Sequence, residues 1–471
     1  MNKFFITTAI AYVNAPPHIG FLLEVVQADV LARYHRRKGE QVFFQSGTDE
    51  HGAKIARAAE AASLPPQELA DANFKKFEEL GEQFNLSWDV FVRTTDQKRH
   101  WPAVYEMWSK LAKSDDLYKK KYRGLYCVGH EAFITEKDLV NGKCRDHDAA
   151  PEVIEEENWF FKLSKYSKEI ESKIKNDELR IMPEGRKNEI LSLIKEGLED
   201  VSFSRPRKGL AWGIPVPGDD SQTIYVWADA LTNYLDYADW WPADVQVIGK
   251  DILRFHAAIW PGMLLSAKMP LPKNLFVHGF ITVDARKMSK TLGNVVSPVE
   301  LLDKYGADPV RYYLLREIPA SEDGDFSYSK FEERYNGDLA NGLGNFAARV
   351  LTLAEKKEFD VNQEFDGEVK DAVDKAKKFV EEKIGEFKLH EALAAIWNLI
   401  GSGDSYVNDK KPWESGDAKA IFGLVVILDN VAALLAPFLP ETSKKITDCI
   451  RWEGNKLKIK KSGILFPRLA F

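Results

Sequence analysis

The spacing of hydrophobic residues near the start of the chain predicts a strand, a helix and a second strand. Lys3–Thr8 is a short run of β-favouring residues, and Pro16-Pro17 follows it in a turn. From Val25 onward, apolar positions recur at steps of three and four, which is typical of a helix with one buried face. Gly39 ends this pattern, and Val42–Phe44 predicts the second strand. Such a unit favours a parallel, doubly wound sheet whose ligands bind beyond the carboxyl ends of its strands.

Later hydrophobic runs predict where this sheet resumes and where it ends. Strand-like runs at Tyr225–Trp227, Val245–Ile248 and Phe276–Val283 follow a long stretch of basic turns, spaced Cys and His, and acidic residues. From residue 336 the pattern is helical, with apolar runs such as Ile421–Leu435. We therefore predict an α/β protein in which an insertion splits a Rossmann-like doubly wound sheet and an all-α bundle follows. The expected segments are 1–116 (sheet, first half), 117–222 (insertion), 223–284 (sheet, second half), 285–335 (connecting region) and 336–471 (bundle).

The composition is that of a folded protein without a strong charge bias. The 471 residues are 45% hydrophobic and 29% charged, which excludes a disordered chain, and the formal net charge of -7 means that any RNA contact must come from local basic patches. The 3 cysteines are too few for a disulfide framework, which favours a reducing, cytoplasmic location. No stretch approaches the roughly 20 apolar residues that span a bilayer, so no membrane association is expected.

A short motif, Pro17-His18-Ile19-Gly20, follows the first predicted strand and opens the first predicted helix. The N-terminus of a helix presents unpaired N–H groups and positive partial charge, which suit a phosphate. His18 can add a hydrogen bond to a phosphoryl oxygen, and Gly20, which lacks a Cβ, lets a flat base approach the backbone. Taken alone, the motif is better explained by a capping histidine beside a packing glycine.

A cationic segment, Lys287-Met288-Ser289-Lys290-Thr291, lies between a predicted strand and the turn at Pro298. Two lysines that bracket small residues form a loop able to hold a leaving pyrophosphate. A solvated basic loop is the usual alternative. The two motifs together are stronger evidence than either alone, because they stand at the two ends of the predicted sheet domain.

These residues resemble the signatures of class I aminoacyl-tRNA synthetases. His18–Phe21 is similar to their HIGH signature, and Lys287–Thr291 is similar to their KMSKS signature. The segments Gly47–Gly52 (GTDEHG), Tyr225–Ala230 (YVWADA) and Gly249–Asp251 are similar to the methionyl-tRNA synthetases of that class. The resemblance covers essentially the whole chain.

The chain departs from the two signatures at two positions. Phe21 stands where the HIGH signature has its second histidine, and Thr291 replaces the last serine of KMSKS but keeps a hydroxyl. The loss of one preorganised donor costs ~2.7–4 kcal/mol of transition-state stabilisation unless a neighbour substitutes. A Phe21→His variant is therefore expected to activate its amino acid at an equal or higher rate.

The resemblance implies ATP-dependent activation of methionine. The methionine carboxylate attacks the α-phosphorus of ATP, pyrophosphate leaves, and methionine passes from methionyl-adenylate to the 3′-terminal adenosine of tRNA(Met). It implies Mg²⁺ accompanying ATP. Catalysis then depends on the positioning of the substrates and on stabilisation of the charge on the phosphoryl oxygens, and it needs no covalent protein nucleophile. The residues implied as catalytic are His18, Lys287 and Lys290, and those implied as ATP-binding are His18, Gly20, Glu24, Gly249, Asp251, Lys287, Ser289 and Lys290.

The resemblance also implies a pocket for methionine. Asp49 would bind the α-ammonium, a charge-assisted contact that any amino acid could make. A thioether offers only apolar area and weak sulfur–aromatic contacts. Each aromatic residue taken alone is more typical of core packing. The pocket walls implied are Ile10, Tyr12, Trp227, Ala230, Tyr234, His256 and Ile259, the last of which stands where the family often has an aromatic residue.

Two Cys-x₂-His pairs in the insertion predict a structural zinc site. Cys127 and His130 form the first pair, and Cys144 and His147 form the second. Paired ligands of this kind suit tetrahedral Zn²⁺, and four protein ligands leave no open catalytic position. Two unrelated cysteines and two surface histidines are the alternative. The methionyl enzymes have a similar zinc knuckle, commonly with a cysteine where His130 stands.

The helical region is implied to bind the anticodon of the tRNA. The residues that match those of the methionyl enzymes are Asn345, Arg349 and Trp413. Aromatic stacking and hydrogen bonds to base edges are the usual means of reading an unpaired loop. A monomer is expected, because the additional dimerising domain of some relatives is not seen after Pro467.

Three functional hypotheses follow. The first is an active methionyl enzyme. The second is a small-molecule nucleotidyltransferase with a HIGH-type site, against which a helical region bearing Trp413 argues. The third is a non-catalytic tRNA-binding relative impaired at Phe21, against which Asp49, Lys287 and Lys290 argue.

Overall fold

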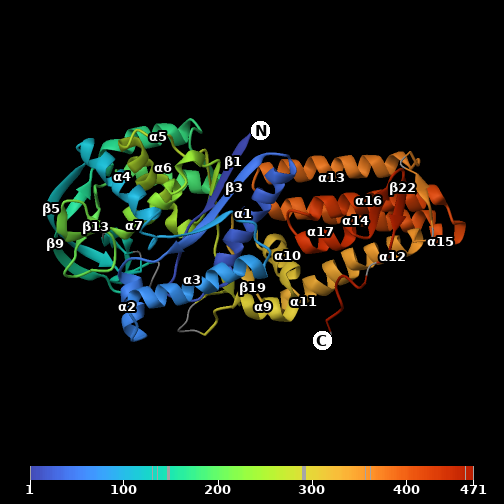
Figure 1. Cartoon of the computed structure of the whole chain (residues 1–471), viewed down its shortest axis with the longest axis horizontal. Helices are drawn as coiled ribbons and strands as arrows, with labels where there is room; N and C mark the ends of the chain where they lie inside the picture. The colour runs from blue at the N-terminus through green and yellow to red at the C-terminus, as the bar shows by residue number, and fades with distance from the viewer. Residues whose placement is uncertain are drawn as a thin grey trace. The chain divides into compact units, whose positions relative to one another are not determined.

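The computed structural model describes residues 2–129, 131–134, 136–145, 149–288, 293–355, 357–360, 362–461 and 463–469, without the side chains of Ala132, Lys287 and Trp452. The chain forms two compact units, each built from more than one stretch of sequence (Figure 1). Unit 1 comprises Met1–Pro17, Gly39–Gly81 and Trp88–Val277, and unit 2 comprises His18–Lys38, Glu82–Ser87 and His278–Phe471. The first helix after the N-terminal strand therefore belongs to unit 2, although the strands on either side of it belong to unit 1.

Unit 1 contains a parallel sheet at its centre. Its strands lie in the order β10 (Arg180–Met182), β16 (Asn274–His278), β15 (Val245–Gly249), β1 (Lys3–Thr8), β3 (Gln41–Asp49) and β2 (Ala11–Tyr12), with β4 (Val90–Arg93) paired to β3. β1 runs parallel to both β3 and β15, and its residues from Phe4 to Thr8 are buried. The predicted parallel sheet is confirmed. Its strands end at Asp49 and Gly249, so both residues lie at the carboxyl edge where ligands bind in such sheets.

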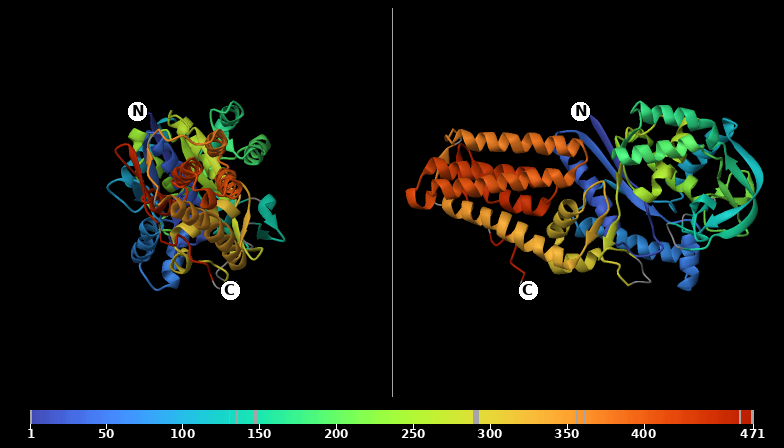
Figure 2. Two further views of the ribbon diagram at one scale, coloured as in Figure 1. Left: turned by 90° about the vertical axis from the view of Figure 1, so that its right-hand side faces the viewer. Right: turned by 180° about the vertical axis from the view of Figure 1, so that it is seen from behind.

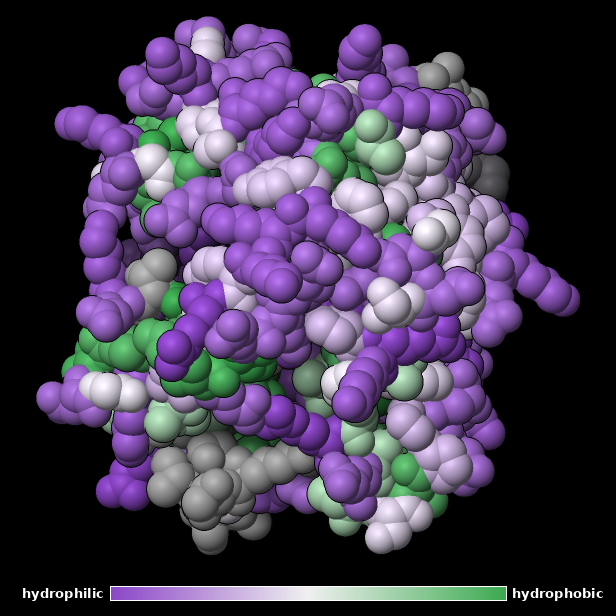
Figure 3. All heavy atoms as spheres, turned by 90° about the vertical axis from the view of Figure 1, so that its left-hand side faces the viewer, coloured by the Kyte–Doolittle hydropathy of each residue, from purple (hydrophilic) through white to green (hydrophobic). Residues whose placement is uncertain are grey.

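Helices and smaller sheets complete unit 1. Its helices are α2 (Ala53–Ala61), α3 (Pro66–Gln83, which crosses into unit 2), α4 (His100–Lys113), α5 (Ser167–Lys175), α6 (Glu184–Glu196), α7 (Val226–Ala230) and α8 (Trp260–Ser266). A four-stranded antiparallel sheet has the order β11 (Val201–Ser202), β9 (Glu152–Phe161), β5 (Leu117–Cys127) and β6 (Ala132–Ile134). A three-stranded sheet has the order β12 (Ser204–Pro206), β14 (Asp219–Ile224) and β13 (Pro215–Val216). Hydrophilic side chains cover most of the face in Figure 3, and hydrophobic ones form separate groups.

Two predicted strands are corrected. The run Tyr225–Trp227 is not a strand, because α7 occupies Val226–Ala230 directly after β14 ends. All five residues of α7 are buried, and so short an apolar run has no period that separates helix from strand. Phe276–Val283 is divided at Gly279 into β16 and β17 (Ile281–Val283). A Cβ at Gly279 would lie 2.1 Å from the carbonyl oxygen of Glu322, so the break requires glycine.

Unit 2 contains the predicted helical region, which is confirmed except that it is not all-α, because a small three-stranded sheet lies within residues 336–471. Its helices are α1 (Ile19–Arg37), α9 (Pro298–Tyr305), α10 (Ala307–Glu317), α11 (Tyr328–Arg334), α12 (Asn345–Ala354), α13 (Gly367–Gly385), α14 (Leu389–Lys410), α15 (Pro412–Ser415), α16 (Ala418–Leu435) and α17 (Pro440–Thr447). Short strands accompany them: β17, β18 (Arg286–Lys287), β19 (Gly324–Phe326), β20 (Phe359–Asp360), β21 (Ile450–Glu453) and β22 (Lys456–Ile459). Helices α13, α14 and α16 pack side by side (Figure 2).

Within the described part of the chain, α16 is the one helix long and apolar enough, by length and composition, to cross a membrane. Its sequence contains the apolar run Ile421–Leu435, which predicted a helix of the bundle and no membrane span. Of its 18-residue window, 61% is buried inside the protein. The helix packs against α12, α13, α14 and α17, so its apolar surface contributes to the core of unit 2.

A buried ion pair joins α1 to the rest of unit 2. The Arg311 guanidinium on α10 lies 2.7 Å from the Asp29 carboxylate on α1, and both side chains are inaccessible to solvent. Arg311 also donates to the carbonyl of Phe438, and Asp29 also accepts from the backbone and hydroxyl of Ser87. The pair is therefore hydrogen-bonded on both sides, which a buried ion pair requires.

Candidate active site

The predicted phosphate motif stands at the N-terminus of α1, where His18 caps the helix. The Nδ1 atom of His18 accepts the backbone N–H of Gly20 at 3.0 Å. Because Nδ1 is an acceptor, the proton of the neutral ring is on Nε2, which is left to donate to another group. Desolvation lowers the pKa of His18, which favours this neutral form although part of the residue remains exposed.

Within unit 2 the phosphate motif meets the segment that carries the lysine motif. The backbone N–H of Ile19 donates to the carbonyl of Val296 at 3.2 Å. A Cβ built at Gly20 would lie 3.7 Å from the terminal methyl carbon of Met288. The backbone of Lys287 lies in β18, which pairs with β17. Ser289 and Lys290 lie outside the described residues. The two motifs, separated by more than 260 positions in the sequence, therefore adjoin one another.

Glu24 has a partner that the sequence analysis missed. Its carboxylate on α1 lies 2.9 Å from Nε2 of His278, a residue 254 positions away. The Nδ1 atom of His278 lies 2.8 Å from the carbonyl of Gly279, which can only accept. Both ring nitrogens then act as donors, so the geometry favours an imidazolium paired with a carboxylate. His278 therefore holds the Glu24 carboxylate in a fixed orientation.

Four of the predicted methionine-pocket residues form one network of ring contacts in unit 1. Tyr12 meets Trp227 edge to face, with ring centroids 6.3 Å apart, and Trp227 meets His256 at the same distance. Tyr234 contacts His256, and its hydroxyl lies 2.7 Å from Nε2. Trp227 also stacks on Phe255, with ring centroids 3.8 Å apart, a contact that the sequence did not predict. Phe255 and His256 belong to a π-helix, Phe255–Ile259.

The hydrogen bonds of His256 determine its tautomer. Its Nδ1 lies 3.0 Å from the carbonyl of Ile252, so Nδ1 donates and Nε2 accepts the hydroxyl of Tyr234. Burial lowers the pKa of His256 to about 4, so the ring is neutral near pH 7. A neutral, oriented pair beside aromatic rings suits an uncharged thioether better than an ammonium or a carboxylate.

Asp49 provides a buried carboxylate at the end of β3. Tyr12 is its neighbour in the sheet, and the backbone N–H of Val13 donates to its carbonyl. The side chain is only 2% exposed, and Oδ1 has no hydrogen-bond partner among the described residues. Burial raises the pKa of Asp49 well above its usual range, and the carboxylates of Asp229 and Glu131 raise it further. A cation beside Oδ1 would favour the charged carboxylate and lower this pKa.

The remaining predicted residues of this set lie around these groups. Ala230 is on α7 with Trp227 and is buried, and Ile10 is half-buried directly before β2. Ile259 lines a cavity of about 530 Å³ on which Phe255 and residues of the insertion also border. Gly249 ends β15 and is buried, whereas Asp251 is exposed in the 3₁₀ turn that follows.

A buried network of hydrogen-bonded aspartate and histidine side chains supports α7. Asp229 on α7 accepts from Nδ1 of His51 at 2.7 Å and from Nε2 of His100 at 2.7 Å. His100, at the start of α4, also bonds to Asp236 at 2.9 Å. Burial opposes the charged imidazolium, but Asp236 and Asp229 outweigh it and raise the pKa of His100 to about 10. This network holds α7 in place, and Trp227 with it. No local signal in the sequence indicates it.

Two of the four predicted zinc ligands are described by the structure, and they lie in the same cluster. Cys127 and Cys144 are both buried and share a small apolar cluster with Ile134. His130 and His147 lie outside the described residues. Among the residues that the structure does describe, no group of three Cys, His, Asp or Glu side chains is placed to hold a metal ion. Two adjacent buried thiols nevertheless suit a soft cation.

The three residues predicted to read an anticodon belong to one surface of unit 2. Asn345 and Arg349 are one turn apart on α12 and share a face. The guanidinium of Arg349 lies 5.1 Å from the ring of Trp413, on α15. Trp413 is 48% exposed, which is unusual for so large an apolar ring, and Asn345 is exposed as well. Arg349 also donates to Asn408, which holds it in place.

Comparison with known proteins agrees with this geometry. The family described as tRNA synthetases class I (M) matches residues 4–144 and 134–351. A methionine–tRNA ligase of Clostridium acetobutylicum is 40% identical over 99% of this chain and 78% of its own length, and one of Brucella suis is 39% identical over 97% and 93%. Methionyl-tRNA synthetase of Mycobacterium tuberculosis in complex with methionyl-adenylate superposes with a TM-score of 0.93 at 36% identity, over 99% of this chain and 100% of that one. The apo form of that enzyme gives a TM-score of 0.86 at 32% identity, over 100% and 99%.

The motifs, the parallel sheet, the helical region and these similarities agree. The chain therefore belongs to the class I tRNA synthetases, and among them to the methionyl-tRNA synthetases.

Proposed function

We propose that this member of the family activates methionine with ATP and transfers it to tRNA(Met), using the residues assigned below. In the first step a methionine carboxylate oxygen attacks the α-phosphorus of ATP and pyrophosphate leaves. In the second step a ribose hydroxyl of the terminal adenosine attacks the methionyl carbonyl, and AMP leaves. The observation that carries the proposal is the junction in unit 2, where Ile19 and Gly20 meet Val296 and Met288.

We assign the phosphates of ATP to unit 2. The Nε2–H of His18 is free of the helix cap and can donate to a phosphoryl oxygen, and the positive partial charge at the N-terminus of α1 favours the same anion. Lys287 and Lys290 stabilise the charge on the departing pyrophosphate, and Ser289 binds beside them. Gly20 lies under the adenine. Mg²⁺, when bound with ATP, neutralises phosphate charge.

For the ribose of ATP we assign Glu24 and Asp251, with Gly249 giving the backbone room to approach. The contact between Glu24 and His278 holds the Glu24 carboxylate in a fixed orientation, in which it would accept from a ribose hydroxyl. Asp251 is exposed directly after the strand that Gly249 ends.

We assign methionine itself to unit 1. Asp49 Oδ1, which lacks a partner among the described residues, accepts from the α-ammonium. The walls for the thioether side chain are Ile10, Tyr12, Trp227, Ala230, Tyr234, His256 and Ile259. Because His256 is neutral and hydrogen-bonded to Tyr234, this pocket presents no net charge to the sulfur.

The insertion is proposed to hold one structural Zn²⁺ through Cys127, His130, Cys144 and His147. The burial of both thiols in one cluster supports this assignment. Bound zinc would crosslink the turn after β5 to the turn after β8 (Lys143–Cys144). Metal analysis of the purified protein is expected to give one equivalent of zinc, and far less than one would refute it. Loss of zinc from a double Cys127→Ala, Cys144→Ala variant provides the matched control.

Residues 336–471 are proposed to bind the anticodon, and residues 117–222 to act as the connective insertion. Trp413, exposed beside Arg349, can stack on an unpaired base, and Asn345 can bond to a base edge. A Trp413→Ala variant is expected to raise the KM for tRNA(Met) by roughly 5- to 150-fold, because stacking on one base contributes ~1–3 kcal/mol. Its rate of ATP–pyrophosphate exchange should not change.

We further propose that the protein is a monomer and is located in the cytoplasm.

Amino-acid-dependent ATP–pyrophosphate exchange tests the proposed function directly. Methionine is expected to support exchange, and a panel of other amino acids is not. Exchange with leucine or cysteine in place of methionine would refute the substrate assignment. Binding of tRNA without any exchange would instead indicate a non-catalytic relative.

A further inference from the structure

A short buried loop follows Asp49 at the carboxyl end of β3. It consists of Glu50, His51 and Gly52, and all three residues are buried. The chain turns into α2 at Gly52, whose φ of 97° lies in the left-handed region that favours glycine. Because the loop is buried and is neither helix nor strand, its backbone groups need hydrogen-bond partners from elsewhere in the protein.

Trp212 supplies two of these hydrogen bonds from a residue 162 positions away. Its indole Nε1–H donates to the carbonyl of Glu50 at 2.6 Å, and its own carbonyl accepts the N–H of Gly52 at 3.3 Å. Its ring meets the imidazole of His51 edge to face, with ring centroids 5.5 Å apart. Trp212 therefore contacts each of the three residues of the loop.

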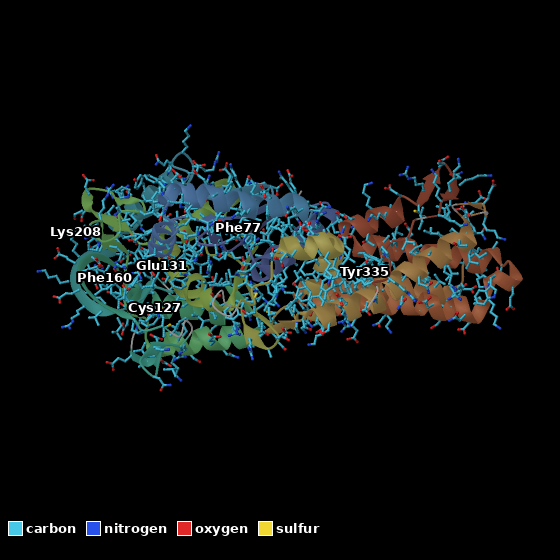
Figure 4. All side chains as sticks on the ribbon, turned by 90° about the horizontal axis from the view of Figure 1, so that it is seen from below. Phe77, Cys127, Glu131, Phe160, Lys208 and Tyr335 are labelled. Carbon is cyan, nitrogen blue, oxygen red and sulfur yellow. The ribbon has the colours of Figure 1, made fainter. Side chains whose placement is uncertain are left out.

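Trp212 belongs to the insertion, in the segment between β12 and β13 that Lys208 marks in Figure 4. The hydroxyl of Thr223 on β14 donates to the carbonyl of Leu210 at 2.9 Å, which ties this segment to β14. Trp212 is only half-buried, so its ring fills less of the core than a fully buried tryptophan would. The hydrogen bonds to the loop are its distinguishing contacts.

Peptide geometry connects Trp212 to Asp49. The carbonyl of Glu50 and the N–H of His51 belong to one planar trans peptide, in which the two groups point in opposite directions. The bond from the indole to the carbonyl therefore fixes the direction of the N–H as well. Burial raises the pKa of Asp49, and the backbone N–H of His51 opposes that rise by stabilising the charged carboxylate. Oδ1 keeps no partner among the described residues.

We propose that Trp212 is a positioning residue for methionine. By fixing the peptide between Glu50 and His51, it orients the Asp49 carboxylate so that Oδ1 meets the α-ammonium group. The inference rests on the proposed function, since it concerns the same amino-acid site, and it gives the insertion a part in methionine binding. In this role Trp212 acts through Asp49 and touches no reacting atom, so its loss should weaken methionine binding more than it slows activation.

The test is a Trp212→Phe variant in ATP–pyrophosphate exchange. Phenylalanine keeps an aromatic ring beside His51 but has no N–H for the carbonyl of Glu50. We expect the KM for methionine to rise roughly 3- to 10-fold, the effect of one lost hydrogen bond, while kcat and the KM for ATP change less than about twofold. A wild-type KM for methionine in this variant would overturn the proposal.

Trp212→Gln makes the reciprocal change. Glutamine carries an N–H donor at the same number of bonds from Cα as the indole Nε1, but it has no ring. Its KM for methionine is expected to lie closer to the wild-type value than that of Trp212→Phe. A higher KM in the glutamine variant would mean that the ring contact matters and would contradict the proposal. If Trp212→Phe does not fold, Trp212→Leu takes its place as the variant without a donor.

Trp159→Phe is the matched control. Trp159 lies on β9 of the same insertion, and its Nε1–H donates to Asp219 on β14 at 2.9 Å, so its hydrogen bond is to β14 and not to the loop after Asp49. The control loses one indole hydrogen bond within the insertion, and its KM for methionine is expected to stay at the wild-type value. An equal rise in both variants would show a general weakening of the insertion and would refute the specific role of Trp212.

A second probe removes the ammonium group from the ligand. The inhibition constant of 4-(methylthio)butanoate, which is methionine without its amino group, should be the same for wild type and Trp212→Phe. A weakening equal to that for methionine would show that Trp212 does not act through Asp49. Wild-type protein without methionine-dependent exchange would instead count against the proposed function itself.

Discussion

The Nδ1 atom of His18 lies 3.0 Å from the backbone nitrogen of Gly20, and the edge of the same ring fills the space that a side chain at position 20 would need. The hydrogen bond caps α1 and leaves the proton of the ring on Nε2. The absence of a Cβ at Gly20 is therefore required by His18 itself, before any nucleotide is considered.

Gly20→Ala tests this relationship. The added Cβ would lie 2.8 Å from Cε1 of His18, so the imidazole must move away from its capping position. Loss of one preorganised donor lowers the rate of ATP–pyrophosphate exchange by roughly 10²- to 10³-fold. Gly401→Ala is the control, because Gly401 lies within α14 and a Cβ there meets no atom within 4 Å. That variant should keep full activity and gain up to ~1 kcal/mol of stability.

Tyr234→Phe tests the pairing in the methionine pocket. Removing the hydroxyl leaves Nε2 of His256 buried without its donor, which costs ~1–3 kcal/mol of the free energy of unfolding. The KM for methionine is also expected to rise. Tyr406→Phe in unit 2 loses a comparable hydrogen bond, to Asp366 at 3.0 Å, and should lose stability without any change in that KM. An unchanged methionine KM in Tyr234→Phe would show that the pair acts only in packing.

Stability should fall on both sides of pH 6.5 because of two buried histidines. His256 has a folded pKa of about 4, so below pH 6.5 the unfolded chain takes up a proton that the folded protein does not, and stability is lost toward pH 4. His100 has a folded pKa of about 10, so its contribution is present below pH 6.5 and is lost as the pH rises toward 10. Denaturant unfolding across this range measures both slopes.

Single substitutions separate the two contributions. His256→Asn is expected to flatten the acid slope, and His100→Asn the alkaline slope, each relative to wild type. An alkaline slope that is the same in His100→Asn and wild type would contradict the assignment of a charged His100.

Arg311→Met should be severely destabilising. It leaves the carboxylate of Asp29 buried without its main counter-charge, and breaking a buried pair in this way costs ~3–5 kcal/mol. The double variant Asp29→Leu, Arg311→Met removes both charges and should recover much of that loss. Arg334→Met breaks the partly exposed pair with Glu317 and is expected to cost less than ~1 kcal/mol. Chemical denaturation of the three variants measures the contrast.

Features that depend on neighbouring residues could be predicted from the amino-acid sequence. The β-favouring run at Lys3–Thr8, the three-and-four spacing of α1 and the long apolar pattern of α16 each carry their own periodicity, so strands, helices and their order could be predicted. The phosphate and lysine motifs were recognisable for the same reason. The strand predicted at Tyr225–Trp227 was wrong because a short, fully buried helix has no hydrophobic periodicity that separates it from a strand.

Contacts between residues far apart in the sequence became visible in the folded protein alone. Glu131 contacts Lys54 across 77 positions, His51 contacts Asp229 across 178, and Glu24 contacts His278 across 254. No local pattern encodes such pairs, because they form when separate stretches of chain are packed together and lose water. Burial then sets their chemistry: it keeps His256 neutral and leaves Oδ1 of Asp49 without a partner among the described residues.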